Sequence, residues 1–421
     1  MSFSEKVLVF ENLDGLSTYI APTQVDGVVT LSGSLKGGEF HAKKSNSKIA
    51  SLSGSMLDKG TVKKSKHDIS EALDSIGADI NFIVSNHHIN FTAHCLSNDL
   101  EKVILLLSEM LQEPRYDSGE LTILKKRIIA NLERSKEDTR KQANINFVSQ
   151  LYPIAHPNAR YNIDDTISMV DNISVEQLKD YHQKAYGLGT INIAAVGDVD
   201  PDSLNQLIIN GFSPMAKQSI SNEYNFPAPN KRVHKFIECI IKDKTSCDLF
   251  VGQSIDINDN HKDYYSLMMG IYILGGNFSA RLMQTVRDEQ GLTYGIGSGM
   301  AGCSYGISGH WYTWGTFSPD LLDKGCEATV EQINRWFETG ITEEELQAKK
   351  TTFKGAFQVS LDTTSGFVDK ILTNAEKGRS IEYLDKYNER IDALDKQSIN
   401  KAIHQYIDPK SLTTSVAGSL K

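Results

Sequence analysis

The stretch Leu274–Ile296 reads Leu-Gly-Gly-Asn-Phe-Ser-Ala-Arg-Leu-Met-Gln-Thr-Val-Arg-Asp-Glu-Gln-Gly-Leu-Thr-Tyr-Gly-Ile. It predicts a helix, a turn at Gly291 and a strand, with Arg287 and Tyr294 seven residues apart across that turn. A guanidinium and a phenol can both donate hydrogen bonds to a developing anion. The alternative is structural: Arg287 complements the end of the helix, and Tyr294 packs on the strand.

Length and composition set broad bounds on the protein. The chain has 421 residues, of which 40% are hydrophobic and 23% charged, so it can bury a full core and is expected to form two domains or more. Asp and Glu (53) outnumber Lys and Arg (44), which gives a net charge of -9. A nucleic-acid partner, which usually requires a clustered basic face, is therefore not expected.

Cysteine usage and the amino terminus bear on the compartment. The five cysteines include no Cys-x-x-Cys pair, which fits neither a disulfide framework nor a thiolate zinc site. The amino terminus offers only the short apolar run 7–10, and no later run approaches membrane-spanning length. We expect a cytoplasmic protein without a transmembrane segment, or a periplasmic or organellar one if a leader has been removed.

The chain carries a weak internal repeat. Matches recur at offsets of 221 to 224 in three separate places: Leu96–Lys102 with Phe317–Lys324, His182–Gly197 with His404–Gly418, and Lys125-Lys126 with Lys349-Lys350. Such spacing predicts two copies of one unit. We therefore predict two homologous domains, residues 1–221 and 222–421, with the seam in the Ser-, Asn- and Pro-containing stretch 217–232.

Within each copy, strands precede helices. Ile80–Cys95 alternates apolar and polar residues, as a half-buried strand does, and Leu100–Leu111 is apolar at helical spacing. Predicted capping pairs are Asn98 with Glu101, Ser174 with Gln177, and Thr342 with Glu345. The expected fold class is α+β, with a mostly antiparallel sheet and helices packed on one face of it in each domain.

A second stretch, Ala50–Thr61, reads Ala-Ser-Leu-Ser-Gly-Ser-Met-Leu-Asp-Lys-Gly-Thr. This stretch resembles the setting of the helix that carries His-x-x-Glu-His in an inverted zinc peptidase, where the histidines bind zinc and the glutamate activates water. On that frame Ser51 and Ser55 take the histidine positions and Gly54 takes the glutamate position. Neutral serine is a poor zinc ligand and glycine accepts no proton, so no catalytic zinc is expected in this chain.

The chain resembles the pitrilysin/insulinase family of zinc peptidases, which also includes the subunits of the mitochondrial processing peptidase. The resemblance covers most of the chain and rests on Ala50–Thr61, Gly77–Asn81, Leu96–Pro114, His156-Pro157, Ala195–Asp198 and Leu274–Ile296. In that family a glutamate downstream of the motif is the third ligand. The corresponding place here is Asn131-Leu132, with Glu133 adjacent.

The resemblance also implies roles for two residues. In the family, an arginine and a tyrosine at this spacing belong to the half of the molecule that lacks zinc, and they reach across an enclosed chamber toward the metal. It implies that Tyr294 donates a hydrogen bond to the oxyanion, and that Arg287 grips the substrate carbonyl or backbone.

The resemblance therefore favours a zinc-less subunit of a heterodimeric peptidase that is inactive alone. The expected partner is a chain of similar length that carries His-x-x-Glu-His and holds the zinc, and the expected substrates are peptides or unfolded polypeptides. The alternative is a catalytically inactive scaffold or assembly subunit, because core subunits of a respiratory complex also resemble this family. A peptidase that acts alone is not expected, because the chain lacks the side chains that would bind a catalytic zinc ion.

Other candidate sites are weaker. His87 and His88 would point to opposite faces of a strand, and His88 and His94 would lie roughly 20 Å apart, so one ion cannot bridge them and we expect exposed polar positions there. Asp68 with Glu71 predicts a capping box rather than a metal pair of His67 with Glu71. Gly275-Gly276 lacks a following Gly-Lys-Ser/Thr, so close backbone approach explains it better than a phosphate loop. No fitting base accompanies Cys239 or Cys247.

Overall fold

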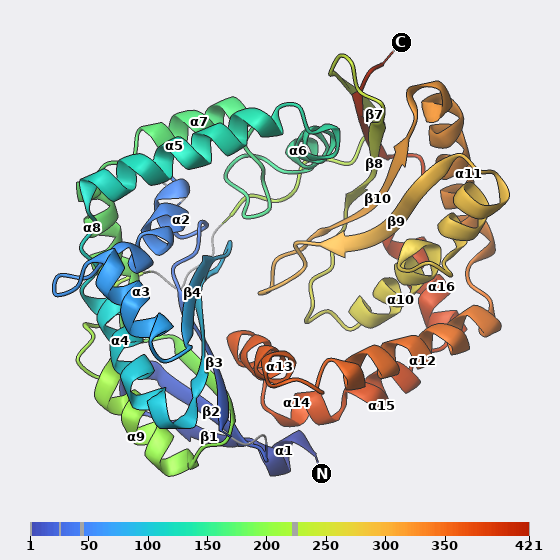
Figure 1. Cartoon of the computed structure of the whole chain (residues 1–421). Coiled ribbons are helices and arrows are strands. Elements are labelled where there is room, and N and C mark those ends of the chain that lie inside the picture. The colour runs from blue at the N-terminus through green and yellow to red at the C-terminus, as the bar shows by residue number, and fades with distance from the viewer. Residues whose placement is uncertain (1, 25–26, 43–45, 221–225, 421) are drawn as a thin grey trace. The chain divides into compact units, whose positions relative to one another are not determined.

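A computed structural model describes residues 2–24, 27–42, 46–220 and 226–420, and they form two compact units (Figure 1). The first unit comprises Met1–Ile129, Thr166–Tyr224 and Ala356–Tyr387, and the second comprises Ala130–Asp165, Asn225–Gly355 and Asn388–Lys421. Each unit thus includes a segment from the other half of the chain. The predicted domain boundary at 221/222 lies outside the described residues.

The first unit is built on a six-stranded mixed sheet in the order β1-β2-β6-β3-β5-β4. Only β2 and β6 are parallel, and the other neighbours are antiparallel. The strands are β1 (Leu8–Glu11), β2 (Leu16–Pro22), β3 (Val28–Lys36), β4 (Asp79–Val84), β5 (His88–Leu96) and β6 (Ile191–Gly197).

The prediction of one strand over Ile80–Cys95 was wrong. The segment forms the hairpin β4–β5, because a turn at 85–87 closes with hydrogen bonds between Ser85 and His88. The alternating apolar positions are even-numbered before the turn (Ile80, Phe82, Val84) and odd-numbered after it (Ile89, Phe91, Ala93). This change of phase was the signal of the break that the prediction missed.

The helices of the first unit follow the chain in several groups. They are α1 (Phe3–Lys6), α2 (Lys48–Ser55), α3 (Lys66–Asp74), α4 (Leu100–Gln112), most of α5 (Ser118–Ser135), α7 (Ile163–Asp171), α8 (Val175–Ala185), α9 (Pro201–Phe212), α13 (Thr364–Glu376) and α14 (Glu382–Asp385). Short 3-10 turns occupy Leu13–Gly15, Leu57–Lys59 and Ser97–Asp99.

The second unit is built on a five-stranded sheet in the order β7-β11-β8-β10-β9. Its strands are β7 (Lys235–Ile240), β8 (Cys247–Ser254), β9 (Thr293–Ala301), β10 (His310–Phe317) and β11 (Thr413–Gly418). Its helices are α6 (Thr139–Leu151), α10 (Tyr264–Gly275), the π-helix η4 (Met283–Glu289), the 3-10 turn η5 (Pro319–Leu321), α11 (Leu322–Thr339), most of α12 (Glu343–Val359), most of α15 (Tyr387–Asp392) and α16 (Lys396–Tyr406).

Five strands have the same order and directions in both units, which confirms the predicted α+β fold built by duplication. β7, β11, β8, β10 and β9 correspond to β2, β6, β3, β5 and β4, and the one parallel pair falls at the same place. A matching contact recurs as well. The Nε2 atoms of His182 and His404 each lie 2.7 Å from a carbonyl oxygen near the end of the corresponding earlier helix, that of Leu111 in α4 and that of Phe337 in α11.

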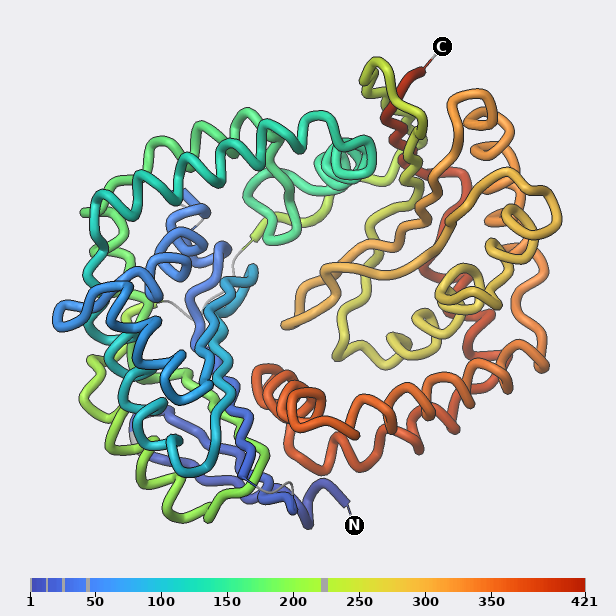
Figure 2. Tube along the Cα trace, in the orientation of Figure 1, coloured from blue at the N-terminus to red at the C-terminus, as the bar shows by residue number. Residues whose placement is uncertain are grey.

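In the first unit, helices cover both faces of the sheet. Strand residues alternate between two cores, since Ile20 and Ala195 face the core under α4 and α9, whereas Ala21 and Val196 face the opposite side. There α13 packs Val368 and Ile371 against the sheet. In Figure 2 the orange-red trace of α13 runs beside the blue trace of β3.

In the second unit, α6 has the equivalent place. Phe147 and Leu151 of α6 pack with Phe250 and Ala417 of the sheet. The predicted layer of helices on one face is therefore completed by one helix on the other face, and that helix comes from a distant part of the sequence. Sequence periodicity indicates that a helix has an apolar side, but not which sheet covers that side.

Two predicted capping pairs are confirmed and two were wrong. Ser174 with Gln177 and Thr342 with Glu345 each exchange two hydrogen bonds between side chain and backbone. Instead of Asn98 with Glu101, α4 follows a 3-10 turn that ends at Asp99. Instead of Asp68 with Glu71, Ser65 caps α3 and Asp68 completes the box, one turn earlier than expected. A search for spanning segments finds no described helix long and apolar enough to cross a membrane.

Candidate functional site

The Arg287 segment leaves α10 and ends in strand β9, as predicted. Its helical part is the π-helix η4, which buries Met283 and Val286 and leaves Arg287 in its last turn. Gly291 has φ +63°, and its N–H donates to the carbonyl of Arg287 at 3.0 Å. A residue in the left-handed region is the usual end of a helix and favours glycine. The turn then places Tyr294 at the start of β9.

Arg287 and Tyr294 lie together on the surface of the second unit. The Arg287 Cζ lies 5.4 Å from the centre of the Tyr294 ring and 5.7 Å from the centre of the Phe278 ring. Tyr294 is 90% exposed, Phe278 is 79% exposed, and the Arg287 side chain is 31% exposed. Neither ring packs in the core, so the Tyr294 phenol faces outward, and the Arg287 side chain beside it is partly exposed. This contradicts the structural alternative for Tyr294, in which its ring packs on the strand.

The segment that carries Arg287 is anchored by an ion pair at its start. Arg281 forms a bidentate pair with Glu345 of α12, at 2.6 and 2.7 Å, and also donates to the Gly340 carbonyl at 2.8 Å. Burial raises the pKa of Glu345, but the hydrogen bonds from Arg281 and Thr342, together with the Arg281 charge, hold that pKa below its ordinary value.

A buried lysine anchors the loop that carries Phe278. Lys349 is 4% exposed, and its Nζ donates to the Asn277 side chain at 2.9 Å and to the Ser279 hydroxyl at 2.7 Å. The sequence pointed to Lys349 only as part of the repeat, and Phe278, Arg281 and their contacts were missed. The available signal was the unusual placement of a phenylalanine between Asn277 and Ser279 in a polar loop.

Close backbone approach explains Gly275, as predicted, but not Gly276. A Cβ on Gly275 would lie 2.5 Å from the backbone nitrogen of Ser298, so this glycine lets α10 end against β9, beside the Arg287 segment. A Cβ on Gly276 would instead lie 2.1 Å from the Tyr272 ring of the same helix.

The stretch with the vacated motif forms α2, in the first unit. Ser51 donates to Glu39, which also pairs with Lys48 at 2.8 Å. Gly54 is buried, and a Cβ there would lie 2.3 Å from a methyl carbon of Val84 in β4. The position where the zinc-peptidase pattern has a glutamate is therefore filled from the neighbouring strand.

We predict that Gly54→Ala destabilises the chain by about 1 to 3 kcal/mol, because the added methyl group meets Val84. In a helix the same change ordinarily stabilises by up to about 1 kcal/mol. In a Val84→Ala background the sign should therefore reverse, which urea denaturation of the four variants measures. An equal effect in both backgrounds would show that Val84 does not close this position.

The place expected for a third ligand is exposed. Asn131 and Glu133 lie on the surface of α5, and Glu133 pairs with Lys136 at 2.9 Å. Lys136 also pairs with Asp164 at 2.6 Å. Among the described residues, no group of three or more His, Cys, Asp or Glu side chains is arranged to hold a metal ion.

The prediction of exposed histidines on the strand was wrong for His87 and His88, which are 8% and 3% exposed. For His88 the reason is α13, whose Glu376 reaches β5 and lies 3.9 Å from His88 Nδ1. His87 instead lies beside the Phe40 ring, with 6.2 Å between the ring centres. Burial lowers the pKa of His88 to about 4 and the pKa of His87 to about 3. The positive charge of Lys36 lowers the pKa of His88 further, and repulsion from protonated His88 and His41 lowers the pKa of His87 further.

These histidines predict a loss of stability in mild acid. A neutral buried histidine has a folded pKa below the unfolded value of about 6.5, so the unfolded chain binds more protons as the pH falls. The contribution of these neutral histidines to the free energy of unfolding should be fully present above a pH of about 6.5. It should decrease as the pH falls toward about 4, by up to about 1.4 kcal/mol per pH unit for each histidine. Urea denaturation across that range measures the slope, and His88→Gln should reduce it. A slope unchanged by His88→Gln would contradict the assignment.

Two models of one protein family match the sequence of this chain. The model described as Insulinase (Peptidase family M16) matches residues 23–156, and the model described as Peptidase M16 inactive domain matches residues 172–353. The first match spans the vacated motif, and the second spans Arg287 and Tyr294.

The chain belongs to peptidase family M16.

Relatives of this M16 chain bear differing names. A Helicobacter pylori protein named Non-peptidase homolog YmxG is 21% identical over 391 residues, covering 92% of this chain and 88% of the relative. A Bacillus subtilis protein named Uncharacterized zinc protease YmxG is 23% identical over 351 residues, covering 83% of each chain.

Solved structures support the fold of the M16 chain. The peptidase M16 inactive domain from Pseudomonas fluorescens matches with a TM-score of 0.89 at 21% identity, over 99% of this chain and 98% of that one. The periplasmic protease PqqL from Escherichia coli matches with a TM-score of 0.80 at 12% identity, over 99% of this chain but 46% of that one. At these identities the likeness establishes the fold alone.

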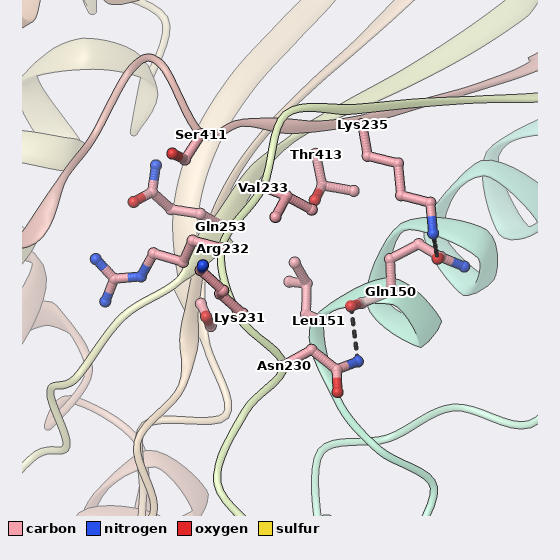
Figure 3. Close-up of a pocket in the computed structure, with 11 residues that line it drawn as sticks. Gln150, Leu151, Asn230, Lys231, Arg232, Val233, Lys235, Gln253, Ser411 and Thr413 are labelled. Atoms are coloured by element: carbon pink, nitrogen blue, oxygen red, sulfur yellow. Dashed lines mark hydrogen bonds between the residues drawn. The ribbon is translucent and has the colours of Figure 1, made fainter.

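A separate pocket of the M16 chain offers no alternative catalytic site (Figure 3). It has a volume of about 190 Å³ in the second unit and is basic, with Lys231, Arg232 and Lys235 in its wall. Lys235 donates to Gln150, and Arg232 pairs with Asp256 at 3.2 Å. The residues that line it include no carboxylate, histidine or cysteine, so it has no side chain suited to act as a general base at neutral pH.

Proposed function

We propose that this M16 chain is the non-zinc subunit of a heterodimeric metallopeptidase, and that it supplies Arg287 and Tyr294 to peptide hydrolysis at the zinc of its partner. The partner is an M16 chain that carries His-x-x-Glu-His. The substrates are peptides or unfolded polypeptide segments. The observation that carries the proposal is the exposed contact of Arg287 with Tyr294, in a chain whose own motif positions are Ser51, Gly54 and Ser55.

The chemistry follows from the two side chains. When water attacks a peptide carbonyl at the partner's zinc, negative charge develops on the carbonyl oxygen, and a preorganised donor lowers the barrier. The Tyr294 hydroxyl is such a donor. Arg287 presents a planar set of N–H groups that suits a carbonyl or an extended backbone, and its contacts with two aromatic rings limit its movement.

The anchoring contacts support a functional role for this surface. Arg281 with Glu345, and Lys349 with Asn277 and Ser279, hold the loop that carries Phe278 and the start of the segment that leads to Arg287. Rigid support of outward-facing donors is what transition-state stabilisation requires.

The experiment that tests the proposal compares the chain alone with the chain plus a zinc-bearing M16 partner. Zinc content and cleavage of a quenched peptide are measured on each. The proposal expects zinc in the partner alone and turnover only in the mixture. Stoichiometric zinc with turnover in the lone chain would overturn it.

The second candidate function is a catalytically inactive scaffold or assembly subunit. It is favoured by the name of the Helicobacter pylori relative, Non-peptidase homolog YmxG, which is given to a protein that covers nearly all of this chain. Peptide cleavage by the mixture of this chain and its partner distinguishes the two functions. If activity persists after Arg287 and Tyr294 are both changed, the chain acts as a scaffold.

A further inference from the structure

Strand β7 lies at one edge of the second sheet, where the first sheet carries one more strand. The order β7-β11-β8-β10-β9 matches β2-β6-β3-β5-β4, and β1 pairs antiparallel with the outer edge of β2. Among the described residues, no strand occupies the equivalent edge of β7.

The pairing of β7 with β11 and the pairing of β2 with β6 align β7 with β2 residue by residue. Gly197 pairs with Pro22 in the first sheet, and Gly418 pairs with Ile240 in the second. This alignment places Glu238 where Ile20 lies and Phe236 where Thr18 lies. In the first sheet those two positions pair with Leu8 and Phe10 of β1.

The main-chain groups of β7 alternate between its two edges. Lys235 N–H donates to the Leu412 carbonyl at 3.1 Å, and Ile241 N–H donates to the Gly418 carbonyl at 2.8 Å. Odd-numbered residues therefore bond to β11. By the alternation of a parallel ladder, the N–H and C=O groups of Phe236, Glu238 and Ile240 face the outer edge.

The outward side chains of this edge are two large apolar residues, Phe236 and Ile240, with Glu238 between them. Phe236 is 55% exposed and Ile240 is 68% exposed, which is unusual for large apolar residues on a strand. Phe236 also lines a groove of about 700 Å³ beside α11, in which Glu327, Glu331 and Glu338 outnumber Arg335. An occupant with a positive charge is therefore favoured over one with a negative charge.

A second copy of the chain does not fit this edge well. Antiparallel pairing of β7 with itself, with Phe236 opposite Ile240, would set Glu238 directly opposite Glu238. Like charges at directly opposed positions are destabilising, and such charges guard edges against self-association.

We propose that the outer edge of β7 accepts an extended strand from a partner polypeptide, which pairs antiparallel as β1 does with β2. Its pattern is apolar-x-Lys/Arg-x-apolar, with the basic residue opposite Glu238 and the apolar residues opposite Ile240 and Phe236. The main-chain hydrogen bonds supply affinity, and the side chains supply selectivity. This surface is independent of the Arg287 site.

The test uses the full chain and a fluorescein-labelled peptide, Thr-Ile-Thr-Lys-Thr-Ile-Thr, with a Glu-centred counterpart. Fluorescence anisotropy should give tighter binding of the Lys peptide by about fivefold, and Glu238→Lys should reverse that preference. Glu11→Lys, on the exposed strand β1, is the matched control and should leave the preference unchanged. A Lys peptide methylated on the lysine amide should lose binding, because that amide would pair with β7.

Hydrogen exchange locates the binding. Amides of Phe236, Glu238 and Ile240 should exchange rapidly in the free chain and become protected with the Lys peptide. The proposal would be overturned if neither peptide binds the chain. It would also be overturned if the Lys peptide binds the wild-type chain and Glu238→Lys equally well, or if the methylated peptide binds as tightly as the unmethylated one. So would a dimer of the wild-type chain that Glu238→Lys abolishes in sedimentation, since the edge would then belong to a second copy.

Discussion

Changing Tyr294 to phenylalanine should lower kcat of the assembled peptidase by about 10²–10³-fold, the effect typical of removing one oxyanion donor. The change removes only a hydroxyl group. The ring remains in place for its contact with Arg287, and because the residue is 90% exposed, folding stability should change by less than about 0.5 kcal/mol. The measurement is steady-state cleavage of a quenched peptide by the mixture.

Matched variants separate the hydroxyl from the ring. Phe278→Leu removes the other aromatic contact of Arg287 without removing a donor, and it should cost far less than Tyr294→Phe. If the two variants reduce kcat equally, the hydroxyl has no special part. If neither reduces it, the Arg287 site does not take part in the reaction.

The second large effect concerns stability. Arg281→Met leaves the Glu345 carboxylate and the Gly340 carbonyl without their donor, at a pair whose side chains are only 18% and 25% exposed. Removing one partner of such a pair should cost about 2 to 3 kcal/mol in the free energy of unfolding, less than for a fully buried pair. It should also loosen η4, and so reduce turnover of the mixture more than it reduces substrate binding.

Lys354→Met is the control for that prediction. Lys354 pairs with Asp392 at 2.7 Å, but with side chains 36% and 55% exposed, so its loss should cost no more than about 1 kcal/mol. Urea denaturation measures both. Equal losses for the two variants would mean that Arg281 acts only as a surface charge.

Much of the fold could be predicted from the sequence, because the decisive signals are local or repeated. The repeat at offsets near 221 predicted two α+β units, and five matching strands confirm it. The helix at Leu100–Leu111, and the two capping boxes that begin with Ser174 and Thr342, depend on neighbouring residues alone. The turn at 85–87 was missed because the change of phase in the alternation, from even-numbered to odd-numbered apolar positions, was not used.

The exchange of α6 and α13 could not be predicted from the same signals. An apolar helix face indicates burial but not the partner, and the sheet that covers α13 lies more than 150 residues away in sequence. The burial of His88 follows from the same exchange. The alternation of β5 predicts that its polar side is exposed to solvent, but α13 covers that side at His88.

For the candidate site, the sequence could indicate the pair but not its support. Arg287 and Tyr294 were marked by their spacing and by the resemblance of their segment to a known motif. Their contact with Phe278, and the anchors Arg281 and Lys349, depend on contacts between η4, the loop before it and α12. The contacts of Arg281 and Lys349 join residues more than 60 positions apart and leave no periodic pattern.

The central claim is that Tyr294 stabilises the oxyanion formed at a partner's zinc, and a transition-state analogue tests it most directly. A phosphinic peptide resembles the tetrahedral intermediate, so its affinity for the assembled pair reports donor contacts that the ground-state substrate lacks. Tyr294→Phe should weaken binding of the phosphinic peptide by the same factor by which it lowers kcat/KM. Unchanged affinity for the analogue in the variant would contradict the claim.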